Sequence, residues 1–391
     1  MDFQLGEKEE ALRGDIRDFT KEKLPPGWMM YMLEEESRDQ DWEFCMSISR
    51  KLSQKGWLTM SWHEEYGGSD ANILDLMIFI EEMGGRLLSG PFFSTMALCS
   101  MPILEYGSDF QKKEFLPEIA AGRQVWTLAF TGQGIGNDLS EKGVWAASDQ
   151  DGYILTGTIG FVPYAHVADY MLVTAGTGAD RGKDTSVFIV DVKSEGLSVE
   201  VMSTTARDKQ CEVRLENVKV PAIDMLGKVK TGRDIVGFIL DRGAVLKSAE
   251  MLGGVRAVLE MTNAYAKERI QFDRPIGSFQ AIQHKLADLF IEIEGLSYVV
   301  YEAAWSLSRG LESGRLISMA KAKANEVYER TCIECMRIHG AVGFTRELDL
   351  GLYHLRTRSY GSAMGDSGFH RERIAMELEA VEAPACQIDR P

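Results

Sequence analysis

Apolar residues recur at three- and four-residue spacing through the first third of the chain. The segments that show this most clearly are DWEFCMSISRKLSQKGWL and ILDLMIFIEEMGGRLL. This spacing places the apolar side chains on one face of a helix. Glycine pairs, Gly67-Gly68 and Gly84-Gly85, interrupt the pattern. We therefore predict a helical domain over residues 1–122.

The pattern changes between residues 123 and 230. Short runs rich in β-branched and aromatic residues follow one another, separated by Gly or Asp: VWTLAFT, GYILTGTIGFV, YMLVTAGT, SVFIVDV, LSVEVM and CEVRLENVKV. Such runs are typical of strands. No helical segment lies between them, which argues against a parallel nucleotide-binding sheet. We predict a central antiparallel β domain.

Helical spacing returns from residue 231 to residue 391, in four long segments. The first is DIVGFILDRGAVLKSAEMLGGVRAVLEMTNAYAKERI, and the last ends in HRERIAMELEAVEA. Helices of this length in a globular protein usually pack as a bundle and often form the centre of an oligomer. The chain is therefore predicted to be mostly α with a central antiparallel β domain, and its domains to cover residues 1–122, 123–230 and 231–391.

Composition excludes two classes of function. The 391 residues carry a net charge of −16, and an acidic surface argues against a nucleic acid partner, because Lys and Arg neutralise the phosphates in such complexes. No apolar run reaches the roughly 18 residues that a membrane span needs. The charged start MDFQLGEKEEALRGDIRDF lacks the features of a signal peptide. We expect a cytoplasmic protein.

The six cysteines are scattered along the chain, which argues against a disulfide framework. Cys332 and Cys335 form a C-x-x-C motif inside a helical segment, and no second pair follows. A zinc site would need further ligands at matching spacing. We interpret the two cysteines as ordinary helix residues rather than as a metal or redox site.

Several stretches, in the right order, resemble the acyl-CoA dehydrogenase family. The strongest is YAKERIQFDRPIGSFQAIQHKLAD at 265–288, which closely follows the family signature. Residues 56–68, residues 106–122 and RIHGAVGFTRE at 337–347 look like further family segments. The resemblance runs along the whole chain. It implies an N-terminal helical domain, a β-barrel-like middle domain and a C-terminal four-helix bundle.

The resemblance also implies FAD as cofactor, an acyl-CoA thioester as substrate and an electron-transfer flavoprotein as electron acceptor. Arg269 can give a forked contact to the pyrophosphate, Phe272 can pack on a ring and Gln280 can bond polar edges. The turn after Arg337, at Gly340, allows the backbone to approach the ligand closely. In the family these groups come from the neighbouring subunit, so a tetramer is implied.

The segments that would face the flavin ring depart from the family pattern. The family loop Thr-Glu-Pro-x-x-Gly-Ser-Asp reads TGQGIGND here, starting at Thr131, so its Glu and Pro are absent. The family strand Trp-Ile-Thr reads Phe161-Val162-Pro163, and proline has neither a hydroxyl nor an N–H. Thr131 and Phe161 remain the expected flavin contacts of this domain, with Phe161 stacking on the ring.

The catalytic base is the third departure. The family usually takes it from the Glu of a Tyr-Glu-Gly-Thr segment, which aligns with Ala363-Met364-Gly365-Asp366. Met364 therefore occupies the position of the base and cannot accept a proton. Its backbone N–H can still bond the thioester oxygen and so acidify the α carbon. Asp366 aligns with the Thr that contacts flavin.

Some relatives place the base on the first helix of the last domain, at the position of Gly243. Glu250 lies seven residues further, on the same helix face and roughly 10 Å along the axis. The alternative for Glu250 is a buried structural acid paired with Arg or Lys. Glu250 and Asp366 are the candidate bases, with Asp241 behind them.

Two functions stay open. The chain is an active acyl-CoA dehydrogenase with an unusual base, or a subunit without its own chemistry that lends Arg269, Phe272 and Gln280 to a related catalytic chain. The residues that would contact a neighbour's flavin match the family pattern better than those that would face the chain's own flavin ring, which is what the second function predicts. The assembly is accordingly a homotetramer or a heterotetramer with a related chain.

Overall fold

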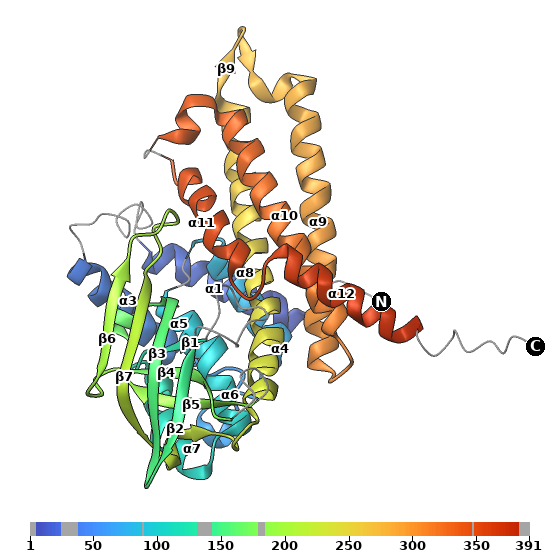
Figure 1. Ribbon diagram of the computed structural model, residues 1–391. Coiled ribbons are helices and arrows are strands. Elements are labelled where there is room, and N and C mark those ends of the chain that lie inside the picture. Colours follow the sequence, from blue (N-terminus) through green and yellow to red (C-terminus); the bar gives the residue numbers. More distant parts are fainter. Residues whose placement is uncertain are drawn as a thin grey trace, which may run out of the picture. The chain divides into compact units, whose positions relative to one another are not determined.

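The computed structural model (Figure 1) describes residues 5–24, 38–87, 90–130, 143–178, 184–345 and 348–382. Contacts divide the chain into two compact units. One comprises residues 1–30, 73–88 and 244–391, and the other residues 31–72 and 89–243. The division into three domains along the sequence stays a prediction. Within the described residues, no helix has the length and apolar character needed to cross a membrane.

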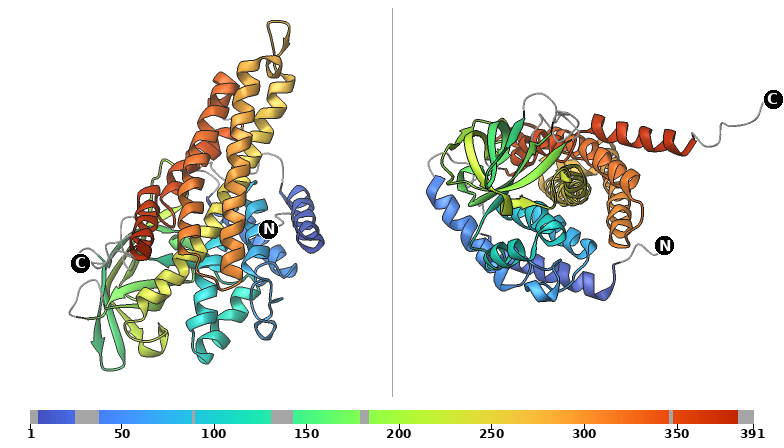
Figure 2. Two further views of the ribbon diagram at one scale, coloured as in Figure 1. Left: turned by 90° about the vertical axis from the view of Figure 1, so that its right-hand side faces the viewer. Right: turned by 60° about the horizontal axis from the view of Figure 1, so that its bottom comes forward.

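The first unit is a bundle of long helices, of which α8, α9 and α10 run side by side (Figure 2). Its elements are α1 (Glu7–Lys23), α4 (Ile73–Gly84), α8 (Gly232–Glu268, from residue 244 on), the hairpin of β9 (Ile270–Gln271) and β10 (Arg274–Pro275), α9 (Gln280–Ser308), α10 (Gly314–His339), α11 (Leu350–Ser362) and α12 (Ser367–Glu382). The four long segments predicted after residue 231 are therefore α8, α9, α10 and α12, and the shorter α11 precedes the last.

Helix α10 shows why these segments pack as a bundle. Its buried side includes Ile317, Lys321, Ala324 and Tyr328, which follow the helical spacing of one face. The backbones of α4 and α8 also approach each other closely, because a Cβ atom on Gly253 would lie 1.8 Å from the carbonyl oxygen of Glu81. The first unit is thus held by apolar faces and by at least one close backbone crossing.

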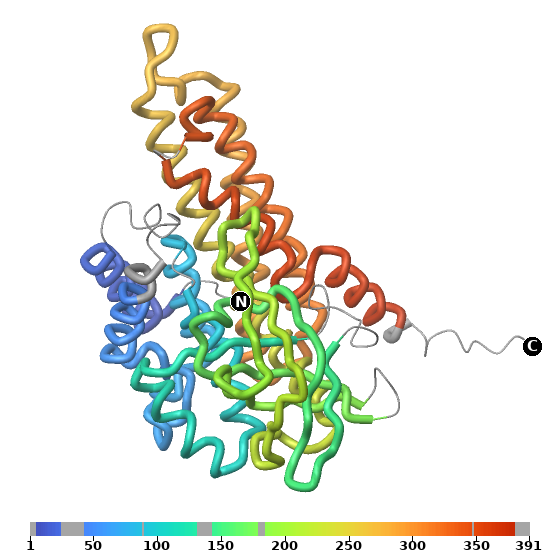
Figure 3. Tube along the Cα trace, turned by 60° about the vertical axis from the view of Figure 1, so that its left-hand side comes forward, coloured from blue at the N-terminus to red at the C-terminus, as the bar shows by residue number. Residues whose placement is uncertain are grey.

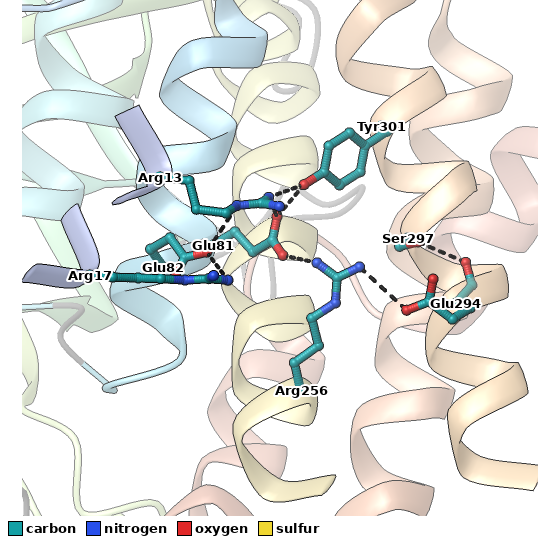
Figure 4. A network of polar contacts seen from close by, with 8 residues as sticks. All are labelled: Arg13, Arg17, Glu81, Glu82, Arg256, Glu294, Ser297 and Tyr301. Carbon is teal, nitrogen blue, oxygen red and sulfur yellow. Dashed lines mark hydrogen bonds and ion pairs between the residues drawn. The ribbon is translucent and has the colours of Figure 1, made fainter. Parts of the chain in front are cut away.

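A buried carboxylate, Glu81, ties four of these helices together (Figure 4). Its Oε2 atom accepts hydrogen bonds from the guanidinium of Arg13 on α1 at 3.1 Å and from the hydroxyl of Tyr301 on α9 at 2.6 Å. Its Oε1 atom pairs with Arg256 on α8. Arg13 also pairs with Glu82 at 3.0 Å. Such a network is stable only because each buried charge has a partner.

The second unit combines short helices with the sheet. It contains α3 (Arg38–Gln54), α5 (Pro91–Phe93), a π-helical turn (Ser94–Cys99), α6 (Ser100–Tyr106), α7 (Asp109–Ala120), β1 (Trp126–Ala129), β2 (Val144–Asp149), β3 (Gly152–Pro163), β4 (Tyr170–Gly176), β5 (Thr185–Asp191), β6 (Leu197–Met202), β7 (Gln210–Pro221) and β8 (Met225–Leu226). Helix α7 begins with a capping box, in which the Oγ of Ser108 accepts from Gln111 N at 3.2 Å. The side chain of Gln111 then donates to the carbonyls of Ile223 and Met225.

The strands form one sheet in the order β6-β7-β3-β2-β4-β5-β8, whose course is followed in Figure 3. The described neighbours along most of this path are antiparallel, but β1 and β2 both pair parallel with β4. β1 lies along the start of β4 and β2 along its end. The mostly helical fold with a central β domain is confirmed, while the sheet is mixed rather than purely antiparallel. Parallel neighbours far apart in sequence leave no hairpin signal.

Candidate functional site

The end of the helical bundle carries three of the predicted flavin contacts. Helix α8 ends at Glu268, the β9–β10 hairpin follows, and α9 begins at Gln280 (Figure 1). Arg269, Phe272 and Gln280 are all exposed there. Arg269 fixes the base of the hairpin with its backbone, since its N–H donates to the carbonyl of Tyr265 and its carbonyl accepts from Ile276, each at 2.8 Å. No ion pair of the Arg269 guanidinium is found among the described residues.

The hairpin tip presents Phe272 in an unusual backbone conformation. Phe272 and Asp273 have φ values of 54° and 62°, a region that residues other than glycine rarely adopt. The ring of Phe272 is 86% exposed. Strained backbone persists where the surrounding structure holds it, and it is frequent at binding sites. The hairpin therefore presents an exposed aromatic ring at its tip.

Arg337, in the last turn of α10, and Gly340, directly after α10, come to the same end of the bundle. The rings of Tyr265 on α8 and His339 on α10 stack with centroids 4.2 Å apart, which places the two helix ends together. Arg337 is exposed and pairs with Glu334. At Gly340 φ is 65°, and an added Cβ would meet no atom within 4 Å. This open glycine leaves room for a ligand to approach the backbone.

These groups fit a dinucleotide. An exposed guanidinium without an ion pair among the described residues suits a phosphate. An exposed ring offers a stacking surface, and the side-chain amide of Gln280 has both donors and an acceptor. Five of the predicted contacts, Arg269, Phe272, Gln280, Arg337 and Gly340, thus share one end of the bundle, whereas Asp366 lies before α12.

Phe161 belongs to the other unit and is turned outward by a β-bulge. The register of β3 against β7 shifts between Ile159 and Val162, and Phe161 lies in that shift with a φ of 58°. Bulges of this kind redirect a side chain and are frequent beside active sites. Phe161 is 57% exposed, which suits the stacking role predicted for it. Thr131 lies outside the described residues.

Met364 stands in the turn between α11 and α12. Its side chain is buried, its φ is 57°, and its carbonyl accepts a hydrogen bond from Nε2 of His370 at 2.8 Å. Among the residues that the structure describes, no acceptor bonds the backbone N–H of Met364. The turn therefore has a backbone donor available at the predicted base position, and no carboxylate there.

Glu250 is buried on α8, with 1% of it exposed. Its Oε2 atom pairs with the ammonium of Lys247, and its Oε1 atom accepts from the hydroxyl of Tyr360 on α11 at 2.8 Å. Both carboxylate oxygens thus have partners, which is what the structural alternative for this residue expects. The role of Glu250 as a base stays a prediction.

Asp366, the other candidate base, is exposed at the start of α12. Its Oδ1 atom accepts from the backbone N–H of Phe369 at 2.8 Å, so one oxygen caps the helix. Asp241 is partly exposed on α8.

The thiols of Cys332 and Cys335 are buried in α10, and burial raises the pKa of both, that of Cys335 to about 11.

Comparison with known proteins identifies the family. The models described as acyl-CoA dehydrogenase, N-terminal domain, and acyl-CoA dehydrogenase, C-terminal domain, match residues 6–123 and 231–379. The probable acyl-CoA dehydrogenase YngJ of Bacillus subtilis is 32% identical over 389 residues, covering 97% of this chain and 100% of that protein. The chain belongs to the acyl-CoA dehydrogenase family. It is a flavoprotein of the oxidoreductase class, with FAD as its cofactor.

Solved structures of acyl-CoA dehydrogenase relatives share the whole fold. The butyryl-CoA dehydrogenase from Megasphaera elsdenii has a TM-score of 0.88 at 26% identity and covers 97% of this chain and 100% of its own. A chain of the ChsE4–ChsE5 complex from Mycobacterium tuberculosis has a TM-score of 0.86 at 28% identity and covers 97% and 99%.

Sequence reasoning missed three residues around the predicted base positions. Lys247, Lys321 and Tyr360 gather by Glu250 and the turn that holds Met364. A signal for Lys321 exists, because a lysine on the apolar face of a helix needs a specific partner. The sequence does not identify the partner of Lys321, because neither helix spacing nor the family signature indicates which atom it bonds.

Proposed function

We propose that this chain takes part in the FAD-dependent α,β-dehydrogenation of an acyl-CoA thioester and that its electrons pass to an electron-transfer flavoprotein. The observation that carries the proposal is the end of the bundle, where Arg269, Phe272 and Gln280 are exposed together. When bound, FAD supplies the ring that accepts a hydride from the β carbon. A cytoplasmic location is part of the proposal.

Each residue at the bundle end has a binding role. Arg269 holds the pyrophosphate through its guanidinium. Phe272 packs its exposed ring on the cofactor, and Gln280 bonds polar edges. Arg337 adds positive charge beside the open backbone at Gly340. These residues serve the site of a neighbouring subunit, whereas Thr131, Phe161 and Asp366 serve the chain's own.

Met364 contributes through its backbone. An N–H aimed at the thioester oxygen stabilises the negative charge that develops there when the α proton leaves. That donor is available in the turn. The proton itself needs a carboxylate within hydrogen-bond reach, and Glu250 and Asp366 are the two candidates.

A second function is favoured by the surroundings of Glu250. Its two oxygens are held by Lys247 and Tyr360, and Met364 replaces the usual base. In this second candidate the chain completes the FAD site of a related catalytic chain and has no chemistry of its own. The similarity to a chain of the ChsE4–ChsE5 complex supports an assembly of two related chains.

One experiment separates the two functions. The chain is purified alone and after co-expression with a candidate related acyl-CoA dehydrogenase chain from the same organism, and the flavin content of each sample is measured. One flavin per chain in the lone protein, bleached by an acyl-CoA from a panel that includes butyryl-CoA, supports the active enzyme. Flavin and bleaching that appear only with the related chain support the second function. A colourless, inert protein in both samples contradicts both.

A further inference from the structure

The turn between α11 and α12 contains a glycine, Gly365, in the left-handed region. Gly365 has a φ of 97°, and a Cβ there would lie 2.4 Å from the ring of Phe369. Only glycine suits this position. The turn is therefore packed tightly against the start of α12, and this packing restricts its backbone conformation.

Lys321 reaches this turn from α10. Its side chain is fully buried, and its ammonium donates to the carbonyls of Tyr360 at 3.0 Å and Gly365 at 3.2 Å and to Oδ1 of Asn325 at 2.5 Å. An ammonium has three donors, so all three are used. One carbonyl belongs to the last turn of α11 and the other to the turn that follows it, so one side chain ties the two together.

Helix α11 gains a C-terminal cap from this contact. The last four carbonyls of a helix have no partner within the helix. Lys321 bonds the carbonyl of Tyr360, and Nδ2 of Asn325 bonds that of Gly361 at 3.2 Å. A positive charge at a helix C-terminus is also favourable for the helix dipole. An apolar side chain at position 321 would remove the donor to the carbonyl of Tyr360.

The peptide unit that carries the Met364 N–H is fixed from both sides. The N–H of Ala363 donates to the carbonyl of Ser359 at 3.0 Å, and the carbonyl of Met364 accepts from His370 at 2.8 Å. Because peptide units are planar, holding the units on each side sets the direction of the one between them. The N–H of Met364 is thereby left as a donor with a fixed direction.

The charge on Lys321 responds to its surroundings. The pKa of Lys321 is lowered to about 7, first by burial and then by repulsion from Lys247 on α8, while Asp366 in the turn opposes the shift. His370 on α12 also faces it, and burial lowers the pKa of His370 to about 4. The Tyr360 carbonyl of α11 completes the surroundings. A neutral amine has one donor fewer than the ammonium, so the three-way contact is complete only when Lys321 is charged.

We propose that Lys321 is a positioning residue that clamps the Ala363–Asp366 turn and aims the backbone N–H of Met364 at the thioester oxygen of the acyl-CoA. The inference that Lys321 holds the turn rests on the contacts of Lys321 alone. The inference that the N–H faces the thioester rests on the proposed function.

The variant Lys321→Met tests the clamp, because it keeps the length of the side chain and removes the donors. Hydrogen–deuterium exchange by mass spectrometry then follows the peptide that contains residues 360–366. We expect exchange in this peptide to rise by about tenfold or more, since lost hydrogen bonds permit local opening. The matched control is Lys323→Met, a half-exposed lysine on the same helix, which should exchange like the wild type.

Kinetics of the chain that bleaches alone with an acyl-CoA test the aim of the N–H. Bleaching that requires the catalytic site of a related chain overturns the aim, because the Met364 turn then faces no reacting thioester. We expect Lys321→Met to lower kcat by about tenfold or more, as loss of a donor to a developing oxyanion does, with KM and FAD content nearly unchanged. A kcat equal to that of Lys323→Met would overturn the positioning role. If no assembly of the wild type is active, the proposed function fails, and the exchange measurement still decides the clamp.

A second variant covers the case in which Lys321→Met does not fold. Asn325→Leu keeps a similar shape but removes one acceptor of Lys321 and the donor to Gly361. Faster exchange confined to residues 360–366 supports the clamp. Wild-type exchange in this peptide overturns it.

Discussion

Arg269 has an exposed guanidinium at the end of α8, and no ion pair of that group is found among the described residues. Replacing it with Ala removes a cation from the proposed pyrophosphate site. We expect the variant to bind FAD more weakly by about 2 kcal/mol, a typical value for charge-assisted hydrogen bonds. Flavin retained after dialysis, or FAD titration by fluorescence, measures this. Arg371→Ala, which removes an exposed arginine on α12, is the control, and equal flavin retention in the two variants would remove the assignment.

Glu250 is the counter-ion of a buried lysine, Lys247. Glu250→Gln would leave the ammonium of Lys247 buried without a carboxylate. We expect the free energy of unfolding to fall by about 3 kcal/mol, as when one partner of a buried pair is removed. If Glu250 is also the base, the variant in addition loses turnover by about a hundredfold while its flavin stays bound. Denaturant unfolding together with steady-state rates distinguishes the two results.

A double variant tests whether the broken ion pair causes the loss of stability expected for Glu250→Gln. Lys247→Met with Glu250→Gln removes both charges, so that no ion stays buried alone. We expect it to recover much of the stability that Glu250→Gln loses, because the two residues are coupled. A double variant as unstable as the single one would show that the ion pair is not the cause.

Lys321 makes stability depend on pH. Its pKa of about 7 in the folded chain lies below the roughly 10.4 of an unfolded lysine, so between these values the unfolded chain binds more protons. Stability then rises with pH from about 7 to about 10. We expect the wild type to gain stability relative to Lys321→Met by on the order of 1 kcal/mol per pH unit between pH 7.5 and 9.5. Unfolding of both proteins across this range measures the difference, and parallel pH curves would contradict the shift.

At the scale of elements, Glu81 joins α1, α4, α8 and α9 within one unit. Glu81→Gln leaves the guanidiniums of Arg13 and Arg256 facing a neutral amide. We expect a loss of about 3–5 kcal/mol in the free energy of unfolding, the range for breaking a buried pair. Arg17→Ala is the control, since Arg17 pairs with Glu82 at the surface and such pairs contribute about 1 kcal/mol at most. Similar losses in both variants would mean that Glu81 adds nothing as a buried hub.

At the scale of the whole molecule, α9 shows an exposed apolar stripe. Ile291, Tyr298 and Trp305 recur every seven residues and are 66%, 49% and 36% exposed. A face of this kind on a long helix favours association. We expect a tetramer by light scattering at micromolar concentration, and we expect Ile291→Arg to dissociate it by placing a charge in the interface. A wild-type monomer under these conditions would rule the assembly out.

Loss of assembly has a further consequence if the bundle end completes a neighbour's cofactor site. Ile291→Arg should then lose flavin although it changes no residue of that end. A dissociated variant that keeps its flavin would place the whole cofactor site within one chain.

The sequence by itself determined the elements and the contiguous motif. Helical spacing located α8, α9 and α10, and runs of β-branched residues located β3, β4 and β7, because both signals are local and repeat over many residues. The signature at 265–288 named Arg269, Phe272 and Gln280 together, since the hairpin that presents them is formed by the same stretch. Local sequence is sufficient where neighbours in the chain are neighbours in space.

Only the tertiary structure decided which distant groups meet. Spacing indicates that Glu250 and Lys321 lie on buried helix faces, yet it does not say that Tyr360 bonds one and that the carbonyl of Gly365 bonds the other. The same holds for β1, whose parallel partner β4 lies beyond two intervening strands. The physical reason is that a buried polar group must find a partner within hydrogen-bond reach, and which atom comes within that reach depends on how whole elements pack.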